Sequence, residues 1–291
     1  MKRFLIILSI FLFAATPVYS SEFSDLFRFQ FKESYYKQEV KSFVKSYVKI
    51  ANKYDYDKLT GLYSEDYINS DGFDNKLFFK LIKGTWDTYP NIKYKFKVKS
   101  IDVTGDYATV AIEETSTATG IAPDNGTLTS FANNVYYLKR FPDGWKIVSD
   151  YILNEKTVLA YGAAKDSIIE LSAPSQIFAG TEYTATLTVI PPENTLVIAS
   201  IGKEKVTHPQ KSAKEVFRKL PEDFILERLF IANTDNINEY VVASVGLTKA
   251  DVKPDKKLSI KVSGLAYAMT RINVTPINKF IEADKDEVKD K

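Results

Sequence analysis

The spacing of apolar residues changes near the start of this chain, from alternation to a helical repeat. Residues 27–32 alternate phenylalanine with polar side chains, a period of two that is typical of an extended segment. From Lys37 to Lys53 apolar residues fall on one helical face, and a lysine recurs every four positions on the other. We therefore expect an arm over 21–36, packed across the body or available to a partner, followed by an amphipathic helix whose lysines face solvent.

Two shorter helices are expected before the first strand. Residues 55–63 favour a short helix, and a turn signal follows at 70–72. Asp74 is placed to cap a third helix that continues to Trp86. Asp71 lies in the turn before it, but the full spacing of a calcium loop is missing, so turn formation and capping account for both aspartates.

The next segments predict two antiparallel hairpins. Strands over 92–103 and 107–117 flank Thr104-Gly105-Asp106, and strands over 134–141 and 145–152 flank Pro142-Asp143-Gly144. In the first strand the apolar positions change from even to odd numbers between Val98 and Ile101. A β-bulge at Lys99-Ser100 would repair that shift and bend the strand.

Counting back from the first turn with the bulge included places one carboxylate on the concave side of the sheet. Phe96 then faces Glu114, and Lys97 faces Glu113 on the outer side. A carboxyl group among aromatic rings has a raised pKa and is a candidate general acid or base. The alternative is that Glu114 lies at an open rim, or bonds a tyrosine hydroxyl and only supports the fold. The aromatic wall expected around Glu114 consists of Trp86, Tyr94, Tyr137 and Tyr151.

Asp150 is the second candidate acid. Regular pairing through the turn at 142–144 puts it beside Tyr136, on the face opposite Trp145, Ile147 and Tyr151. If the aromatic face is the concave one, Asp150 points away from the pocket.

The order of elements over 37–155 is accompanied by short sequence matches to a known family. They are Tyr56-Asp57-Lys58-Leu59, Leu62-Tyr63-Ser64, Tyr67-Ile68, Asp71-Gly72 and Asp143-Gly144-Trp145-Lys146-Ile147-Val148. On these residues the segment resembles the nuclear-transport-factor-2-like superfamily, which includes polyketide-cyclase-like and ketosteroid-isomerase-like members. The resemblance implies three helices on a curved antiparallel sheet around a cone-shaped pocket. In many enzymes of that superfamily an acidic residue or a histidine near the pocket abstracts a proton, and this segment contains no histidine.

The second half of the chain is patterned as short strands separated by turns. We expect a boundary near 161–164 and an all-β domain over 165–278, with a disordered charged tail over 279–291. The rhythm of strands and turns resembles a bacterial immunoglobulin-like sandwich. The predicted fold class is therefore α+β over 37–160, followed by an all-β sandwich.

The first twenty residues have the three parts of a secretory signal peptide. Lys2 and Arg3 precede the apolar run 4–15, and residues 16–20 lead to a cleavage position near Ser20. The apolar run is shorter than the roughly 20 residues that span a bilayer. We expect a secreted or periplasmic bacterial protein with no integral membrane segment after cleavage.

Composition excludes several kinds of chemistry. The chain has no cysteine and one histidine, His208, so disulfides, thiolate nucleophiles, lipid-modified cysteines and histidine-based triads are excluded. We therefore expect no metal and no cofactor. Without the leader, the 39 basic residues become 37 and equal the 37 acidic ones, which argues against nucleic-acid binding.

Two functions remain open. One is an exported, non-catalytic protein whose pocket binds a small apolar ligand or an envelope protein, with a homodimer through the first half as a further expectation. The other is an isomerase, cyclase or dehydratase that uses Glu114 or Asp150 together with tyrosine hydroxyls. An enzyme requires a closed cavity with an inward carboxylate within hydrogen-bond distance of a tyrosine.

Overall fold

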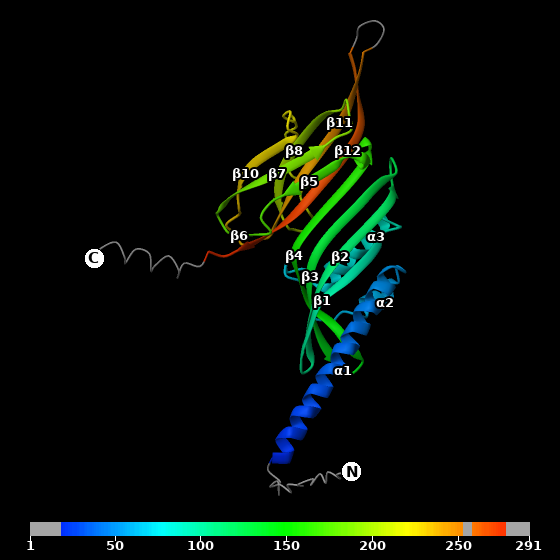
Figure 1. The fold of residues 1–291 in the computed structure, drawn as a ribbon, viewed down its shortest axis with the longest axis vertical. Helices are drawn as coiled ribbons and strands as arrows, with labels where there is room; N and C mark the ends of the chain where they lie inside the picture. The colour runs from blue at the N-terminus through cyan, green and yellow to red at the C-terminus, as the bar shows by residue number, and fades with distance from the viewer. Residues whose placement is uncertain (1–18, 253–257, 278–291) are drawn as a thin grey trace, which may run out of the picture.

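The computed structural model describes residues 19–252 and 258–277, and Figure 1 shows their arrangement. Three helices come first in the chain, and four long strands follow them. The helices are α1 (Tyr19–Ala51), α2 (Tyr56–Thr60) and α3 (Asn75–Thr88). The strands are β1 (Lys93–Thr104), β2 (Tyr107–Ile121), β3 (Gly126–Phe141) and β4 (Gly144–Gly162).

A short 3₁₀ helix, η1 (Ala163–Asp166), leads into a second half that consists of strands. The strands of this half are β5 (Ile168–Ser172), β6 (Gln176–Phe178), β7 (Glu182–Ile190), β8 (Leu196–Lys205), β9 (Arg218–Lys219), β10 (Ile225–Ile231), β11 (Glu239–Val252) and β12 (Leu258–Thr275).

One sheet passes from the first half into the second without interruption. Its strand order is β1-β2-β3-β4-β12-β11-β8-β9, because β4 pairs antiparallel with β12 from Lys156–Thr270 to Gly162–Gly264. The expected boundary near 161–164 coincides with the end of β4. The second half also contains a separate sheet of order β10-β7-β5, which packs on the part of the first sheet formed by β12, β11 and β8 (Figure 1).

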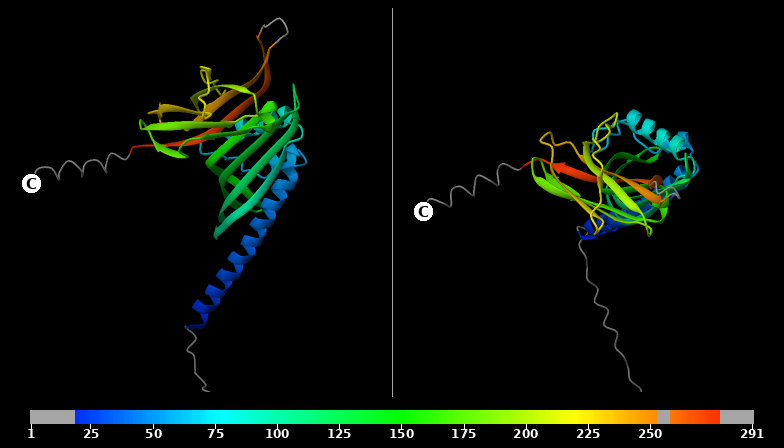
Figure 2. Two further views of the ribbon diagram at one scale, coloured as in Figure 1. Left: turned by 45° about the horizontal axis from the view of Figure 1, so that its top comes forward. Right: turned by 90° about the horizontal axis from the view of Figure 1, so that it is seen from above.

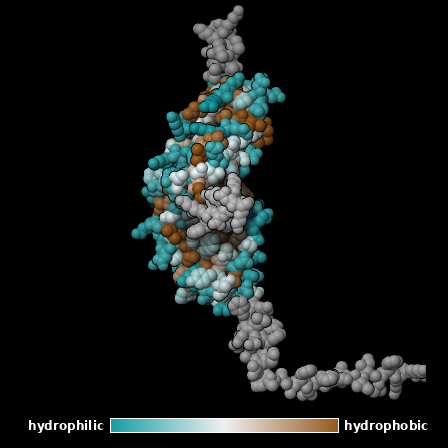
Figure 3. Space-filling view, turned by 90° about the vertical axis from the view of Figure 1, so that its left-hand side faces the viewer, coloured by the Kyte–Doolittle hydropathy of each residue, from teal (hydrophilic) through white to brown (hydrophobic). Residues whose placement is uncertain are grey.

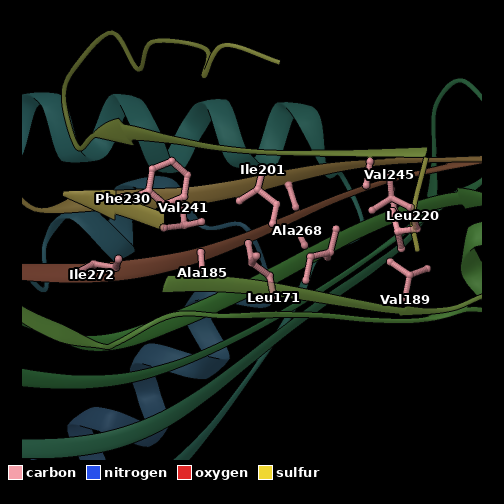
Figure 4. Packing of buried hydrophobic residues seen from close by; sticks show 14 of the residues in the cluster. Leu171, Ala185, Val189, Ile201, Leu220, Phe230, Val241, Val245, Ala268 and Ile272 are labelled. Carbon is pink, nitrogen blue, oxygen red and sulfur yellow. The ribbon is translucent and has the colours of Figure 1, made fainter. Parts of the chain in front are cut away.

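Each half has its own hydrophobic core. In the first, the predicted apolar face of α1, including Val40 and Val44, packs on the concave side of the sheet against Val110 and Ile112. Seen from above, α3 covers one side of the curved strands (Figure 2). In the second, side chains of the two sheets interdigitate, as Figure 4 shows for a set of labelled residues. Among them are Ala185, Val189 and Val241, all without solvent exposure.

The extended arm expected over 21–36 is wrong, because α1 already begins at Tyr19. Residues 19–36 contain no proline or glycine, so nothing in them ends the helix that starts as the amphipathic segment. Extending an existing helix adds one hydrogen bond per residue and avoids the cost of nucleation. Three alternating phenylalanines do not outweigh that gain.

At the level of fold class the prediction is confirmed: antiparallel sheet predominates, and a few helices pack on it. Within the described ranges no helix is both long and apolar enough to cross a membrane. Figure 3 shows scattered apolar patches on an otherwise polar face. The predicted tail at 279–291 and residues 1–18 of the predicted signal peptide lie outside the described residues.

Candidate functional site

A cavity of about 330 Å³ lies between the helices and the concave face of β1 to β4, and β11 closes part of its wall. Its aromatic side chains are Tyr47, Phe73, Phe78, Trp86, Tyr94, Phe96, Tyr136 and Tyr240. Its polar side chains are Asn69, Asp71, Thr85, Glu114, Ser130, Asn134, Asp150 and Glu155.

Glu114 reaches this cavity through the register that the sequence predicts. Strand β1 has its irregularity between Val98 and Ser100, and Phe96 pairs with Glu114. Glu113 consequently faces the outer side, where Lys99 lies 3.1 Å from its carboxylate. Two adjacent glutamates on one strand therefore have opposite environments.

The Glu114 carboxylate is held by two neutral donors. Ser116 Oγ donates to one oxygen over 3.1 Å, and Asn134 Nδ2 donates to the other over 3.0 Å. Burial raises the pKa of Glu114 to about 7; the nearby charges of Glu155 and Asp150 act in the same direction, and the two hydrogen bonds oppose them. Among the described residues that line the cavity, no cationic side chain compensates for this burial.

Asn134 itself is only partly satisfied. Its side chain is 8% exposed, and its Nδ2 group donates to Glu114. Its Oδ1 atom is buried and has no hydrogen-bond partner among the described residues. A buried acceptor without a partner costs stability, so a hydrogen-bond donor that reached Asn134 Oδ1 would be stabilising.

Asp150 also lines the cavity, and the expectation that it points away is wrong. Between Tyr137 and Leu138 the pairing of β3 with β4 shifts, and Val148 becomes an extra residue in β4. The bulge moves Asp150 to the same face as Ile147.

Tyr67 Oη donates to Asp150 Oδ2 over 2.5 Å. Burial raises the pKa of Asp150 to about 6, and the Tyr67 bond opposes that rise. Burial and the neighbouring Asp150 raise the pKa of Tyr67. The hydroxyl of Tyr67 therefore stays protonated and available as a donor to the carboxylate.

Two of the four expected wall residues are in place. Trp86 and Tyr94 line the cavity, and Trp86 Nε1 donates to the Tyr94 hydroxyl over 3.1 Å. Asn52 bonds both the amide and the carbonyl of Tyr94, each over 2.8 Å, and so holds β1 to the end of α1. Burial raises the pKa of Tyr94 to about 12.

Tyr137 and Tyr151 do not line the cavity, so their placement in its wall is wrong. Tyr137 is 42% exposed because even-numbered residues of β3, such as Tyr136, occupy the inner face. Tyr151 follows the Val148 bulge, which places its neighbours Asp150 and Ile152 inside.

The second half contributes groups that the sequence did not indicate. Arg271 in β12 donates to both carboxylate oxygens of Asp71, over 3.0 and 2.6 Å, and its own side chain is fully buried. Tyr240 in β11 donates to Glu155 over 3.4 Å. Burial raises the pKa of Glu155. Arg271 is visible as a charge within an apolar strand, but its partner is not visible from the sequence.

A metal site is not apparent in the described part of the chain, where no cluster of three or more histidine, aspartate or glutamate side chains is arranged to hold an ion. The cavity instead combines two carboxyl groups whose pKa values lie near neutral pH with an aromatic surface, and a tyrosine hydroxyl donates to one of the two carboxyl groups. Such a set can bind a small organic molecule and exchange protons with it.

The sequence matches no family model and no curated protein. Among solved structures, Bd1075 from Bdellovibrio bacteriovorus is 19% identical, with 40% of this chain and 39% of that chain covered and a TM-score of 0.35. An NTF2-like protein with a cystatin-like fold from Novosphingobium aromaticivorans is 19% identical over 45% of this chain and 86% of that chain, with a TM-score of 0.33. A candidate dehydratase of the NTF2-like family from Streptomyces avermitilis is 18% identical over 40% and 93% of the two chains, with a TM-score of 0.36.

Two of these three proteins are described as NTF2-like, and the chain spans about two fifths of the length of Bd1075. At such scores the similarities say nothing about activity. What the cavity does has to be inferred from its own residues.

Proposed function

We propose that the cavity binds a small organic molecule and exchanges protons with it through Glu114. The observation that carries the proposal is a carboxyl group in the cavity wall with a pKa of about 7 and no cationic partner there. A general acid or base is most effective when its pKa lies near the working pH, because both protonation states are then populated. An ordinary solvated glutamate would be fully ionised and a poor proton donor.

Asp150 is a second acid–base group in the cavity wall, and Tyr67, buried behind that wall, donates to its carboxylate. Their 2.5 Å hydrogen bond supplies the carboxylate–tyrosine pair that an enzyme of the isomerase, cyclase or dehydratase kind requires. This pair favours catalysis over the alternative of non-catalytic binding of an apolar ligand. An apolar pocket for binding alone would not need four carboxyl groups in its wall.

The place of action is part of the proposal. Lys2, Arg3 and the apolar run 4–15 support export to the periplasm or the medium. The second half then acts as an immunoglobulin-like support that closes the cavity through Tyr240. An envelope protein or a second copy of the chain remains a proposed partner of the first half.

The test uses the purified chain and two matched variants. Native mass spectrometry identifies the molecule that co-purifies. Incubation in D₂O and return to H₂O then show whether deuterium enters its carbon-bound positions, where Glu114 would remove a proton from carbon and return a deuteron. We expect incorporation with the wild type and with Glu113→Gln, whose side chain faces outward, and its loss with Glu114→Gln. A ligand that stays bound to all three proteins without any exchange would contradict catalysis and leave the binding function.

A further inference from the structure

The charges of the cavity wall have one sign. Among the described residues that line it there are four acids and no lysine, arginine or histidine. Arg271 neutralises one of the four, Asp71, from behind the wall. Glu114, Asp150 and Glu155 remain without a cation bound to them in the wall, so the cavity is complementary to positive charge.

A separate observation points to a ligand that donates hydrogen bonds. Asn134 is 8% exposed, and its Oδ1 atom has no partner in the described part of the chain. Its Nδ2 group is already used by Glu114, so the unpaired atom is the acceptor. The ammonium group of an amine has three N–H donors and no acceptor, which matches the Asn134 oxygen and the carboxylates beside it.

The aromatic surface fits the rest of such a molecule. Tyr47 stacks on Phe96 with ring centroids 5.4 Å apart, and Tyr136 lies 6.1 Å from Tyr47. The negative faces of aromatic rings attract organic cations. Leu81 and Ile82 of α3 add aliphatic surface to the same cavity. The wall of the cavity therefore offers acidic groups to the cation and apolar groups to its body.

We propose that the ligand of this cavity is a protonated organic amine with an aromatic or aliphatic body. This inference rests on the function proposed above for the cavity. The ammonium group of the amine donates to Glu114 and to Asn134 Oδ1, and its body packs on the Tyr47–Phe96–Tyr136 rings. An uncharged alcohol could satisfy Asn134, but it would leave the carboxylates without a counter-charge. An organic anion would be repelled by them.

Binding of a cation also predicts a linked release of protons. The groups that face Glu114 are the donors Ser116 and Asn134 and the acids Glu155 and Asp150. Asp150 in turn faces Tyr67, Asp71 and Arg271, and Glu155 faces Tyr240 and the same Asp71–Arg271 pair. A cation beside Glu114 favours its ionised form and lowers its pKa. Affinity for the amine should therefore rise as the pH increases through 7.

The experiment compares three probes of one shape and three charges: 2-phenylethylamine, 2-phenylethanol and phenylacetate. Fluorescence of Trp86 in the cavity wall and calorimetry report binding to the purified full chain. We expect the amine to bind at least about tenfold more tightly than the alcohol at about pH 8, because hydrogen bonds between charged groups are stronger than those of neutral groups. We expect most of this preference to be lost at about pH 5, where Glu114 is protonated.

Variants assign the effect to the named residue. Glu114→Gln should lose most of the preference for the amine, because it lacks the carboxylate that accepts from the ammonium group, while Glu113→Gln keeps the full preference. Circular dichroism checks that both variants are folded. Calorimetry of the wild type in buffers of different ionisation enthalpy measures proton release and needs no variant. The amine should release protons near pH 7, and the alcohol should release none.

Several results would overturn the inference. They are equal affinity for amine and alcohol at about pH 8, preference for phenylacetate, or no binding of the amine at millimolar concentration by folded protein. Equal binding of amine and alcohol would leave the proposed proton exchange intact. Conversely, amine preference without deuterium at the carbon-bound positions of the amine would overturn catalysis and retain the ligand class.

Discussion

The guanidinium of Arg271 donates two hydrogen bonds to the carboxylate of Asp71, although the two residues lie 200 positions apart. The arginine side chain has no exposed surface, and the aspartate side chain is 6% exposed. Asn238 adds a bond to the same carboxylate over 2.7 Å, and Asn273 Oδ1 accepts from the arginine Nε over 3.0 Å. A turn of the first half is thereby joined to β12 of the second.

Replacing Arg271 should be strongly destabilising. In Arg271→Met the Asp71 carboxylate stays buried without its counter-charge, which costs about 3–5 kcal/mol. The double variant Arg271→Met with Asp71→Asn should cost less than the sum of the two single changes, because neither charge is then left unpaired. Urea unfolding of the four proteins measures this coupling. Additive single effects would mean that the two side chains do not interact.

The shared sheet predicts that the two halves unfold together. Both tryptophans, Trp86 and Trp145, lie in the first half, whereas the far-ultraviolet circular dichroism signal includes the strands of both. Because β4 pairs with β12 over seven residue pairs from Lys156 to Gly162, the fluorescence and dichroism midpoints should coincide. Two separated midpoints would show that the halves unfold independently.

Glu114 should make the protein less stable as the pH rises. Its pKa is raised in the folded state to about 7, so between the unfolded value and 7 the native protein binds more protons than the unfolded chain. The contribution of Glu114 to the free energy of unfolding is therefore most favourable below about pH 4.5. It falls as the pH rises to about 7 and beyond, and the total loss is at most about 3 kcal/mol.

Urea unfolding at about pH 5 and about pH 8 checks this prediction. Glu114→Gln should make the decrease smaller, with the remainder due to Asp150 and Glu155, whose pKa values burial also raises, and it should be more stable than the wild type at the higher pH. Glu113→Gln serves as the control and should keep the decrease. A wild type whose stability did not fall across this range would contradict the burial of an uncompensated carboxyl at position 114.

Tyr67→Phe should change the titration of Asp150. The tyrosine hydroxyl stabilises the ionised carboxylate, so its removal should raise the pKa of Asp150 above its present value of about 6. The lost hydrogen bond should also cost about 1–2 kcal/mol of stability. Carboxyl carbon chemical shifts across a pH titration report the first effect. Tyr137→Phe, at an exposed position, should change neither.

Two glycines with a similar positive φ should respond differently to substitution. Gly105 has a φ of 59° in the open turn of the first hairpin, and Gly162 has a φ of 55° at the end of β4. A Cβ atom at Gly162 would overlap the carbonyl oxygen of Ser263, whereas one at Gly105 would meet nothing within 4 Å. Gly162→Ala should therefore lower the melting temperature more than Gly105→Ala. Equal decreases would mean that β12 yields to the added methyl group.

Local pattern was sufficient where turns and alternation act over short distances. The hairpin turn at Gly105 and the parity shift before Ile101 placed Glu114 opposite Phe96, because a two-residue period and one bulge leave a single register that keeps apolar residues inside. The amphipathic face of α1 was equally visible, because a helix repeats its contacts every three to four residues.

The sequence by itself therefore determined the antiparallel hairpins, the faces of the main helix and the inward direction of Glu114. Only the tertiary structure decided that Asp150 belongs to the cavity, since the bulge at Val148 has no signature in the strand's own alternation. It also decided that Arg271 and Tyr240 complete the site. Their partners Asp71 and Glu155 become neighbours only when β4 pairs with β12, and side-chain pairing across such a distance leaves no periodic trace in the chain.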